Sequence, residues 1–273
     1  MIAAFALLAA CAPPVCNGSA DLCERRIDEV AFAGTHNAMS NADEGWIAPN
    51  QTHAPLQQLA EGIRVLVFDL HPLDDGTPGL CHGYCSLGSK PLVDGLSELR
   101  TFLDANPDEV VVVIFESYLP EREVDASFVA SGLSAYAYAG SSDPWPTLGT
   151  LIDVNQRLIV FTDDASTTLP WHRYSYTSLW ENPYHAEAAE ELATQCGLDR
   201  GDRALPLWTL NHFLTAPLAS AELAASVNFD PFFEDRVRAC MAETGDFPNF
   251  VLVDFYDVGD VLAVVSSLNT ESP

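Results

Sequence analysis

Short apolar runs alternate with amphipathic stretches along most of the chain. Val110–Phe115 is apolar without interruption, which is typical of a parallel strand that is covered on both faces. Six such runs are predicted to be strands: Val30–Ala33, Arg64–Leu70, Val110–Phe115, Leu158–Thr162, Leu205–Leu210 and Phe250–Phe255. The segments between them that have a helical pattern are Leu56–Glu61, Leu92–Asn106, Ala186–Cys196 and Pro231–Thr244.

This alternation continues through most of the 273 residues without an internal linker, which favours a single α/β domain curled into a barrel over an open sheet. The six predicted strands are fewer than the eight of a complete TIM barrel, so closure is itself an expectation. An apolar fraction of 48% is enough to build a core and excludes a disordered chain.

The charge balance is strongly acidic. The chain has 12 Lys+Arg against 39 Asp+Glu, a formal net charge of −27, and Lys90 is its single lysine. Binding to nucleic acid or to an anionic bilayer by charge alone is excluded, because each needs a basic surface. An anionic ligand would need its charge neutralised by something other than basic side chains, and a metal ion is the obvious candidate.

The N-terminal segment indicates export. Residues 1–11 are apolar, too short to span a membrane, and end at Cys11 in a pattern similar to a bacterial lipobox. Because no Lys or Arg precedes the apolar run, a plain N-terminal stretch remains the alternative. We therefore expect an export or lipoprotein signal at 1–11, a short polar leader at 12–24 and the folded domain at 25–273, exported to a bacterial cell envelope or secreted.

The other six cysteines favour disulfides, since an even number in an exported chain is typical of bridges. The close pairs are Cys16 with Cys23 and Cys81 with Cys85, which leaves Cys196 with Cys240. Zinc binding by Cys81-His82-Gly83-Tyr84-Cys85 is the weaker alternative, because no second cluster at ligand spacing is present.

Polar and ionisable side chains recur where the predicted strands end, which is where an α/β barrel carries its chemistry. They are His36, Asn37, Asp69, His71, His82, Glu116, Asp163, Asp164, Asn211, His212, Asp254 and Tyr256. Any one of them could be a satisfied hydrogen-bonding group or a loop charge. Histidines and carboxylates at successive strand ends are less easily explained in that way.

Four segments in this order resemble the X domain of phosphatidylinositol-specific phospholipase C: Ala31–Asn37, Gly62–Asp69, Cys81–Gly83 and Val111–Glu116. The similarity is greatest to the secreted bacterial, fungal and plant phospholipase-C-like phosphodiesterases, and it continues through Pro144–Gly149, Leu210–Leu214 and Val253–Tyr256. It runs from about residue 25 to residue 268. The resemblance implies a distorted, incompletely closed TIM barrel.

The resemblance also implies a mechanism. Cleaving a phosphodiester without a protein nucleophile needs a base, an acid and positive charge, and histidine suits the first two roles because its pKa lies near neutrality. The matching positions are His36 as base and His82 as acid. Asp254 matches the carboxylate that orients His36, with capping of a turn or metal binding as its alternative roles. The attacking group in the family is the substrate's own inositol hydroxyl, so a cyclic phosphate is expected.

The resemblance offers two sources for the positive charge that stabilises the transition state, a basic side chain or a metal ion. Metal-independent members have an arginine where this chain has His71, which could serve as a cation itself or bind another metal. Calcium-dependent members have four oxygen ligands, of which Asn37, Asp69 and Glu116 match and Val67 departs. Such hard oxygen ligands suit Ca²⁺, or alternatively Mg²⁺. We therefore expect a divalent cation.

The expected substrate is a phosphodiester, an inositol phospholipid or a related head group, although soluble glycerophosphoinositol stays open. Contacts to it are predicted for His71, Arg64, Tyr256 and Trp208, with packing in the core or rim as the competing interpretation of the aromatics. A lipid anchor at Cys11 would hold the protein on its own membrane.

Two other functions remain open. The first is a non-catalytic envelope lipoprotein that binds a ligand on the same barrel, which Val67 keeps in consideration. The second is a hydrolase of the glycerophosphodiester phosphodiesterase type, although His36 is followed by Asn37 and not by the arginine usual there.

Overall fold

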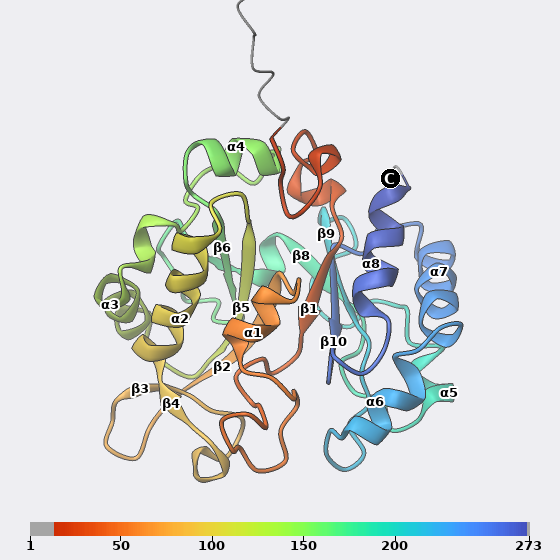
Figure 1. Ribbon diagram of the computed structural model, residues 1–273, viewed down its shortest axis with the longest axis horizontal. Helices are drawn as coiled ribbons and strands as arrows, with labels where there is room; N and C mark the ends of the chain where they lie inside the picture. The colour runs from red at the N-terminus through yellow and green to blue at the C-terminus, as the bar shows by residue number, and fades with distance from the viewer. Residues whose placement is uncertain (1–13, 272–273) are drawn as a thin grey trace, which may run out of the picture.

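A computed structural model describes residues 14–271. Within this range, eight strands form one curled parallel sheet in the order β7-β6-β5-β2-β1-β10-β9-β8 (Figure 1). Their bounds are β1 Phe32–Thr35, β2 Val65–Pro72, β5 Val111–Ser117, β6 Leu158–Thr162, β7 His172–Tyr174, β8 Leu179–Glu181, β9 Leu207–Asn211 and β10 Phe250–Val253. The short strands β3 Pro78–Leu80 and β4 Lys90–Pro91 pair antiparallel beside β2.

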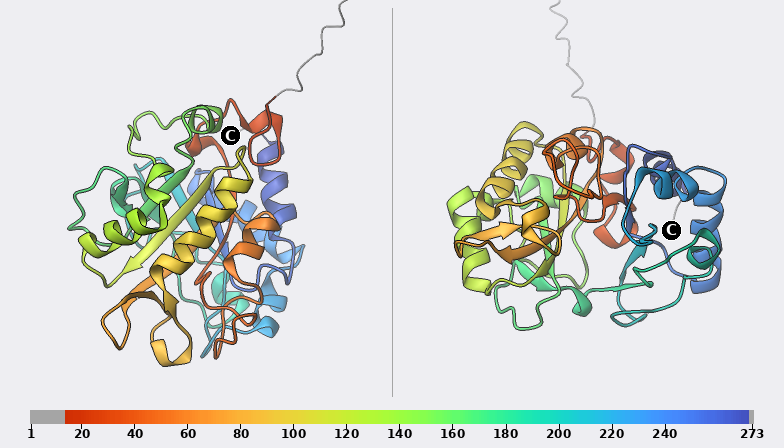
Figure 2. Two further views of the ribbon diagram at one scale, coloured as in Figure 1. Left: turned by 60° about the vertical axis from the view of Figure 1, so that its left-hand side comes forward. Right: turned by 90° about the horizontal axis from the view of Figure 1, so that it is seen from below.

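Helices cover the outside of this sheet. They are α1 Pro55–Ala60, α2 Leu92–Ala105, α3 Glu121–Ser131, α4 Leu148–Asp153, α5 Ala189–Leu192, α6 Ala221–Val227, α7 Phe232–Thr244 and α8 Val261–Thr270. Helices α2 and α3 flank one side of the strands, and α7 and α8 flank the other (Figures 1 and 2).

The barrel is incompletely closed, as the family resemblance implies. Strands β7 and β8 follow each other along the chain but are the two ends of the strand order, and no pairing joins them in the part of the chain that the structure describes. Both are only three residues long, too short to be predicted from an apolar run. The chain is thus one distorted (β/α) barrel in a single domain.

The longest predicted elements are confirmed because burial follows their pattern. Strand β5 begins with three fully buried valines. Helix α2 turns Leu92, Leu96, Leu99 and Leu103 to the core, the spacing of one helix face, and ends at the predicted stop before Pro107. The predicted helix Ala186–Cys196 is wrong over most of its length, since only Ala189–Leu192 is an α-helix.

Gly34 brings β1 close to both of its neighbours. A Cβ atom there would lie 2.5 Å from a methyl group of Leu252 and 2.7 Å from Cβ of Val65. Only glycine allows this approach, so residue 34 sets the position of β1, the strand that His36 follows.

Three disulfides are present in residues 14–271, Cys16–Cys23, Cys81–Cys85 and Cys196–Cys240, which confirms the predicted pairs. The sulfurs of Cys81 and Cys85 are bonded to each other, so they cannot be the thiolate ligands of a zinc ion.

The N-terminal part of the described chain packs on the barrel. The Asn17 side chain exchanges two hydrogen bonds with the backbone of Val110, of 2.7 and 3.0 Å, at the amino end of β5. The predicted export segment 1–11, with Cys11, lies outside the described residues. Among residues 14–271, no helix combines the length and the apolar character needed to cross a bilayer.

Candidate active site

The carboxyl ends of the strands surround a pocket of about 320 Å³. Six residues predicted from the strand ends line it together: His36, Asn37, Asp69, His71, His82 and Glu116. They come from the segments after β1, in β2, after β3 and in β5. Because β1, β2 and β5 are parallel, their carboxyl ends meet at one edge of the barrel, and the antiparallel β3 runs back toward that edge.

His36 is held from three directions. Its Nδ1 lies 3.0 Å from Oδ1 of the buried Asp254, and its ring stacks on Phe213 with centroids 4.0 Å apart and planes 3° apart. Its Nε2 lies 3.0 Å from the Asn37 amide nitrogen. A carboxylate such as Asp254 can only accept, so the ring proton sits on Nδ1, and the unprotonated Nε2 accepts from the Asn37 amide.

The electrostatic surroundings favour the charged form of His36. Burial lowers the pKa of this imidazole, but the nearby carboxylates of Asp254, Asp69 and Glu116 raise the pKa by more, so it lies above its usual value. Asn50 donates a second hydrogen bond to Asp254, of 3.2 Å, which keeps that carboxylate in place.

Two carboxylates stand side by side on neighbouring strands. Asp69 and Glu116 are register partners in β2 and β5, and Asp69 is only 5% exposed. Burial and the charge of Glu116 raise the pKa of Asp69 to about 8. The Tyr118 hydroxyl donates to Glu116 over 2.5 Å, and no Lys or Arg forms an ion pair with either carboxylate in residues 14–271.

This donor set fits a hard cation only with help from other oxygen ligands. Among the residues that the structure describes, no group of three or more His, Cys, Asp or Glu side chains is arranged to hold a metal ion. A cation would therefore be bound by Asp69 and Glu116, by the amide oxygen of Asn37 and by water. Val67, where a fourth ligand is expected, contributes none.

His82 and His71 form the outer wall of the pocket. His82 follows β3 on an exposed loop, and its pKa is lowered by desolvation and by the neighbouring His36. His71 stacks on Tyr118, with centroids 4.4 Å apart, and its pKa is lowered by desolvation. The pocket thus opens between a deeply held imidazole and two that lie near solvent.

Three residues predicted to contact substrate lie elsewhere. Arg64 precedes β2 at the opposite end of the barrel, where its Nε is 2.7 Å from Glu109. Trp208 is 1% exposed and stacks on Trp180 in the core, with centroids 4.8 Å apart. The buried Tyr256 donates its hydroxyl to Glu61 over 2.7 Å. None of these three residues lines the pocket, and their contact with substrate stays a prediction.

The inner end of the site contains groups that sequence reasoning missed. A deeper cavity is lined by His36, Asp69 and Glu116 together with Asp163, Tyr176, Glu181 and Arg200. Arg200 lies 2.5 Å from Glu181 and over the ring of Tyr184. Asp163 is among the strand-end residues that the sequence indicates, whereas Arg200 comes from a loop without a pattern.

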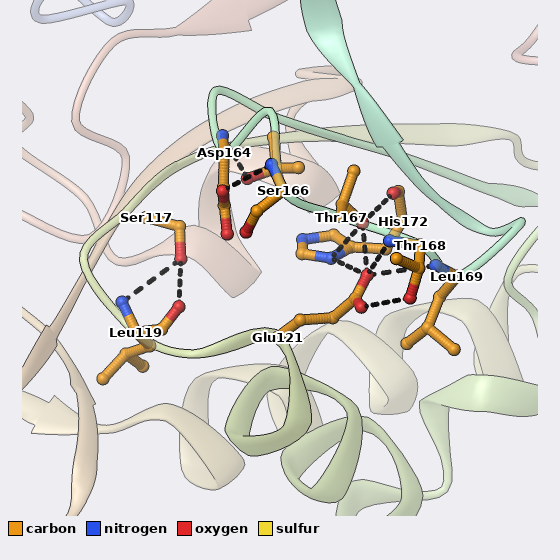
Figure 3. Close-up of polar contacts among 10 residues, drawn as sticks. Ser117, Leu119, Glu121, Asp164, Ser166, Thr167, Thr168, Leu169 and His172 are labelled. Atoms are coloured by element: carbon orange, nitrogen blue, oxygen red, sulfur yellow. Dashed lines mark hydrogen bonds and ion pairs between the residues drawn. The ribbon is translucent and has the colours of Figure 1, made fainter.

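The loop after Asp163 is fastened to α3 by Glu121 (Figure 3). The Glu121 carboxylate accepts hydrogen bonds from both Thr167 and Thr168 and from the backbone N–H of Leu169. These bonds outweigh burial and lower the pKa of Glu121 to about 2. The buried His172 lies beside it, 3.5 Å away. One side chain thus fixes the loop that follows Asp163, a residue that lines the deeper cavity.

Comparison with known proteins agrees with this architecture. The sequence model of the PI-PLC X family (PI-PLC X 1) matches residues 22–269. PI-PLC X domain-containing protein 1 of Arthroderma benhamiae is 31% identical, over 93% of this chain and 89% of the relative. An uncharacterized secreted protein of the same fungus and an Arabidopsis thaliana PI-PLC X domain-containing protein are each 27% identical, and this chain spans 61% and 60% of their lengths.

Solved structures have the same fold. Phosphatidylinositol-specific phospholipase C from Listeria monocytogenes superposes with a TM-score of 0.60 at 16% identity, covering 91% of this chain and 94% of that one. The Staphylococcus aureus phosphatidylinositol-specific phospholipase C superposes with a TM-score of 0.65 at 12% identity, covering 92% and 95%. By its sequence and its barrel, the chain belongs to the PI-PLC X family.

Proposed function

We propose that this protein cleaves a phosphoric diester by the phospholipase C route, with His36 and His82 as the acid–base pair. The observation that carries the proposal is that both imidazoles line one pocket, with Asp254 behind His36 and the Asp69–Glu116 pair beside it. With the phosphodiester between the rings, one imidazole could take the proton of the attacking hydroxyl and the other could give a proton to the leaving oxygen.

His36 acts as the base in this proposal. The substrate's attacking hydroxyl replaces the Asn37 amide as the donor to Nε2, and Nε2 takes its proton, while Asp254 holds the other ring proton on Nδ1 and stabilises the imidazolium that forms. The attacking oxygen forms its bond to phosphorus as the bond to the leaving oxygen breaks. His82 donates its proton to that leaving oxygen.

A divalent cation completes the proposed site. The two carboxylates are close together without a basic partner, and a bound Ca²⁺ or Mg²⁺ would neutralise them and stabilise negative charge on the phosphate. Asp69, Glu116 and Asn37 are its proposed ligands. Calcium binding measured by titration calorimetry, with Asp69→Asn as the control, tests this independently of catalysis.

An inositol phospholipid is the proposed substrate. A second cavity of about 320 Å³ begins at His36 and His82 and continues along an apolar wall that includes Ile47, Tyr84 and Leu218, which are 62%, 77% and 59% exposed. An apolar leaving alcohol would cover these side chains. We also propose that the protein is exported, since its disulfides form in oxidising compartments and one relative is named as secreted.

The test is a substrate panel of phosphatidylinositol, its glycosylated form and phosphatidylcholine, with products identified by phosphorus NMR. We expect a cyclic inositol phosphate, and its loss in His36→Ala. A linear phosphate formed directly would favour the glycerophosphodiesterase alternative. Binding without turnover of any of the three would favour a non-catalytic binding protein, the alternative that Val67 keeps open.

A further inference from the structure

His82 lacks the supports that His36 has. In the described part of the chain, no residue makes a hydrogen bond or an ion pair with the His82 ring. The backbone groups of His82 and Gly83 also make no hydrogen bond within residues 14–271. A side chain that must place a proton on one oxygen atom needs a fixed position, since small displacements cost large factors in rate.

The disulfide Cys81–Cys85 encloses this segment. Cys81 is fully buried directly after β3, and its N–H donates to the carbonyl of Asp69 over 3.3 Å. Cys85 begins a short 3₁₀ turn that ends at Leu87, whose carbonyl accepts from the N–H of Ile47 over 2.7 Å. The ring closed by the disulfide spans residues 81–85. Its first residue is therefore fixed in the core, and its last is fixed through Leu87 to the loop that contains Ile47.

Gly83 makes the turn within the ring. Its φ of +64° lies in the left-handed region, which glycine adopts without strain. Because the sulfur–sulfur bond holds the ends of the ring, few backbone conformations remain for His82 and Gly83. The disulfide thus restricts the backbone from which the His82 imidazole reaches the pocket.

We propose that the Cys81–Cys85 disulfide is the positioning element for His82, holding its imidazole where it can protonate the leaving oxygen. This inference rests on the proposed function. It makes Cys81 and Cys85 positioning residues and not merely stabilising ones. It also means that the protein reaches full activity only when this bond is formed.

The experiment compares two myo-inositol phosphodiesters that differ only in the leaving group, a 4-nitrophenol or a primary alkyl alcohol. The nitrophenolate departs without a proton, whereas the alkoxide needs a general acid. The ratio of the two kcat values therefore reports on the acid and is insensitive to a general loss of folded protein. His82→Ala provides the reference value for a missing acid.

The variant Cys81→Ser/Cys85→Ser is expected to lose about tenfold or more on the alkyl substrate and to keep most of its rate on the nitrophenyl substrate. The matched control is Cys16→Ser/Cys23→Ser, which removes a local disulfide at the other end of the barrel. We expect this control to leave the ratio of the two rates unchanged, even where it lowers the melting temperature.

Three results would overturn the inference. The double variant could keep its alkyl rate, or it could lose both rates by the same factor while it melts cooperatively. If the intact protein cleaves neither diester, the proposed function fails and the inference fails with it. The intact protein distinguishes the two failures. If it is inactive, the proposed function fails, and if it is active while the double variant gives either of the first two results, only the positioning role fails.

If the double variant does not fold, a second pair of variants tests whether the backbone of this ring positions His82. Gly83→Val keeps the disulfide but strains the positive φ, and no atom lies within 4 Å of the added Cβ. It should lower the alkyl rate more than the nitrophenyl rate. Gly83→Asn tolerates a positive φ and should shift the ratio less. Equal ratios in these two variants would contradict the positioning role.

Discussion

The two histidines of the pocket are supported in opposite ways. His36 follows a core strand and is fixed by Asp254, Phe213 and Asn37. His82 is on an exposed loop, where a disulfide ring surrounds it. This difference fits the proposed roles. His36, the base, has its pKa raised by a buried carboxylate, whereas His82, the acid, must regain its proton after each turnover and can take it from solvent.

The largest effect is expected from His36→Ala. Loss of the base should lower kcat by about 10²–10⁴ on any leaving group, because every substrate must have its attacking hydroxyl deprotonated. His82→Ala should match this loss only for alkyl leaving groups. Steady-state rates on the two diesters check the contrast. Equal losses for both variants on both substrates would remove the distinction between base and acid.

Asp254→Asn should have the next largest effect, a loss on the order of tenfold. The Asp254 carboxylate is the largest of the influences that raise the pKa of His36, so its removal lowers that pKa. The base then stays neutral to lower pH, and the acid limb of the kcat/KM profile should move to lower pH. An unchanged or oppositely shifted limb would show that Asp254 does not act through His36.

Asp69→Asn should abolish calcium binding and at the same time stabilise the metal-free protein. Because the folded-state pKa of Asp69 is raised to about 8 from 3.8, its ionisation opposes folding increasingly as pH rises through that window. The neutral amide removes this opposition, so the metal-free melting temperature should rise by about 2–4 °C at pH 8. A fall in melting temperature would show that Asp69 is stabilised by a group other than a cation.

Glu121→Gln should have the smallest effect on catalysis, because the side chain fastens a loop and does not line the pocket. Its folded-state pKa of about 2 lies below the ordinary value, so the carboxylate stabilises the fold above about pH 4.5, and this contribution is lost as pH falls toward 2. We expect a loss of about 1 kcal/mol at pH 7 that disappears in acid. Urea unfolding at the two pH values measures it.

The sequence predicts the parts of the fold that repeat. Strand β5 and helix α2 have burial patterns long enough to be recognised, and six of the eight parallel strands follow from such runs. The strands β7 and β8 were missed because three residues show no period. The open edge of the barrel lies between these two strands, so the place where closure fails could not be located from the sequence.

The candidate site was predictable where it depends on strand ends. Asp69 and Glu116 face one pocket because parallel strands end together. Trp208 and Arg64 lie away from this pocket, and a sequence does not show to which layer of the barrel, or to which of its ends, a side chain points. Phe213 and Arg200 were missed because stacking and loop contacts leave no periodic signal.

The central claim is that two imidazoles cleave one phosphodiester, with His36 as the base and His82 as the acid. The most direct measurement is a phosphorus NMR time course of phosphatidylinositol cleavage by the wild-type protein and by His36→Ala at equal concentration. A cyclic inositol phosphate that accumulates with the first and is absent with the second is the predicted result. The same product formed at the same rate by both proteins would contradict the claim.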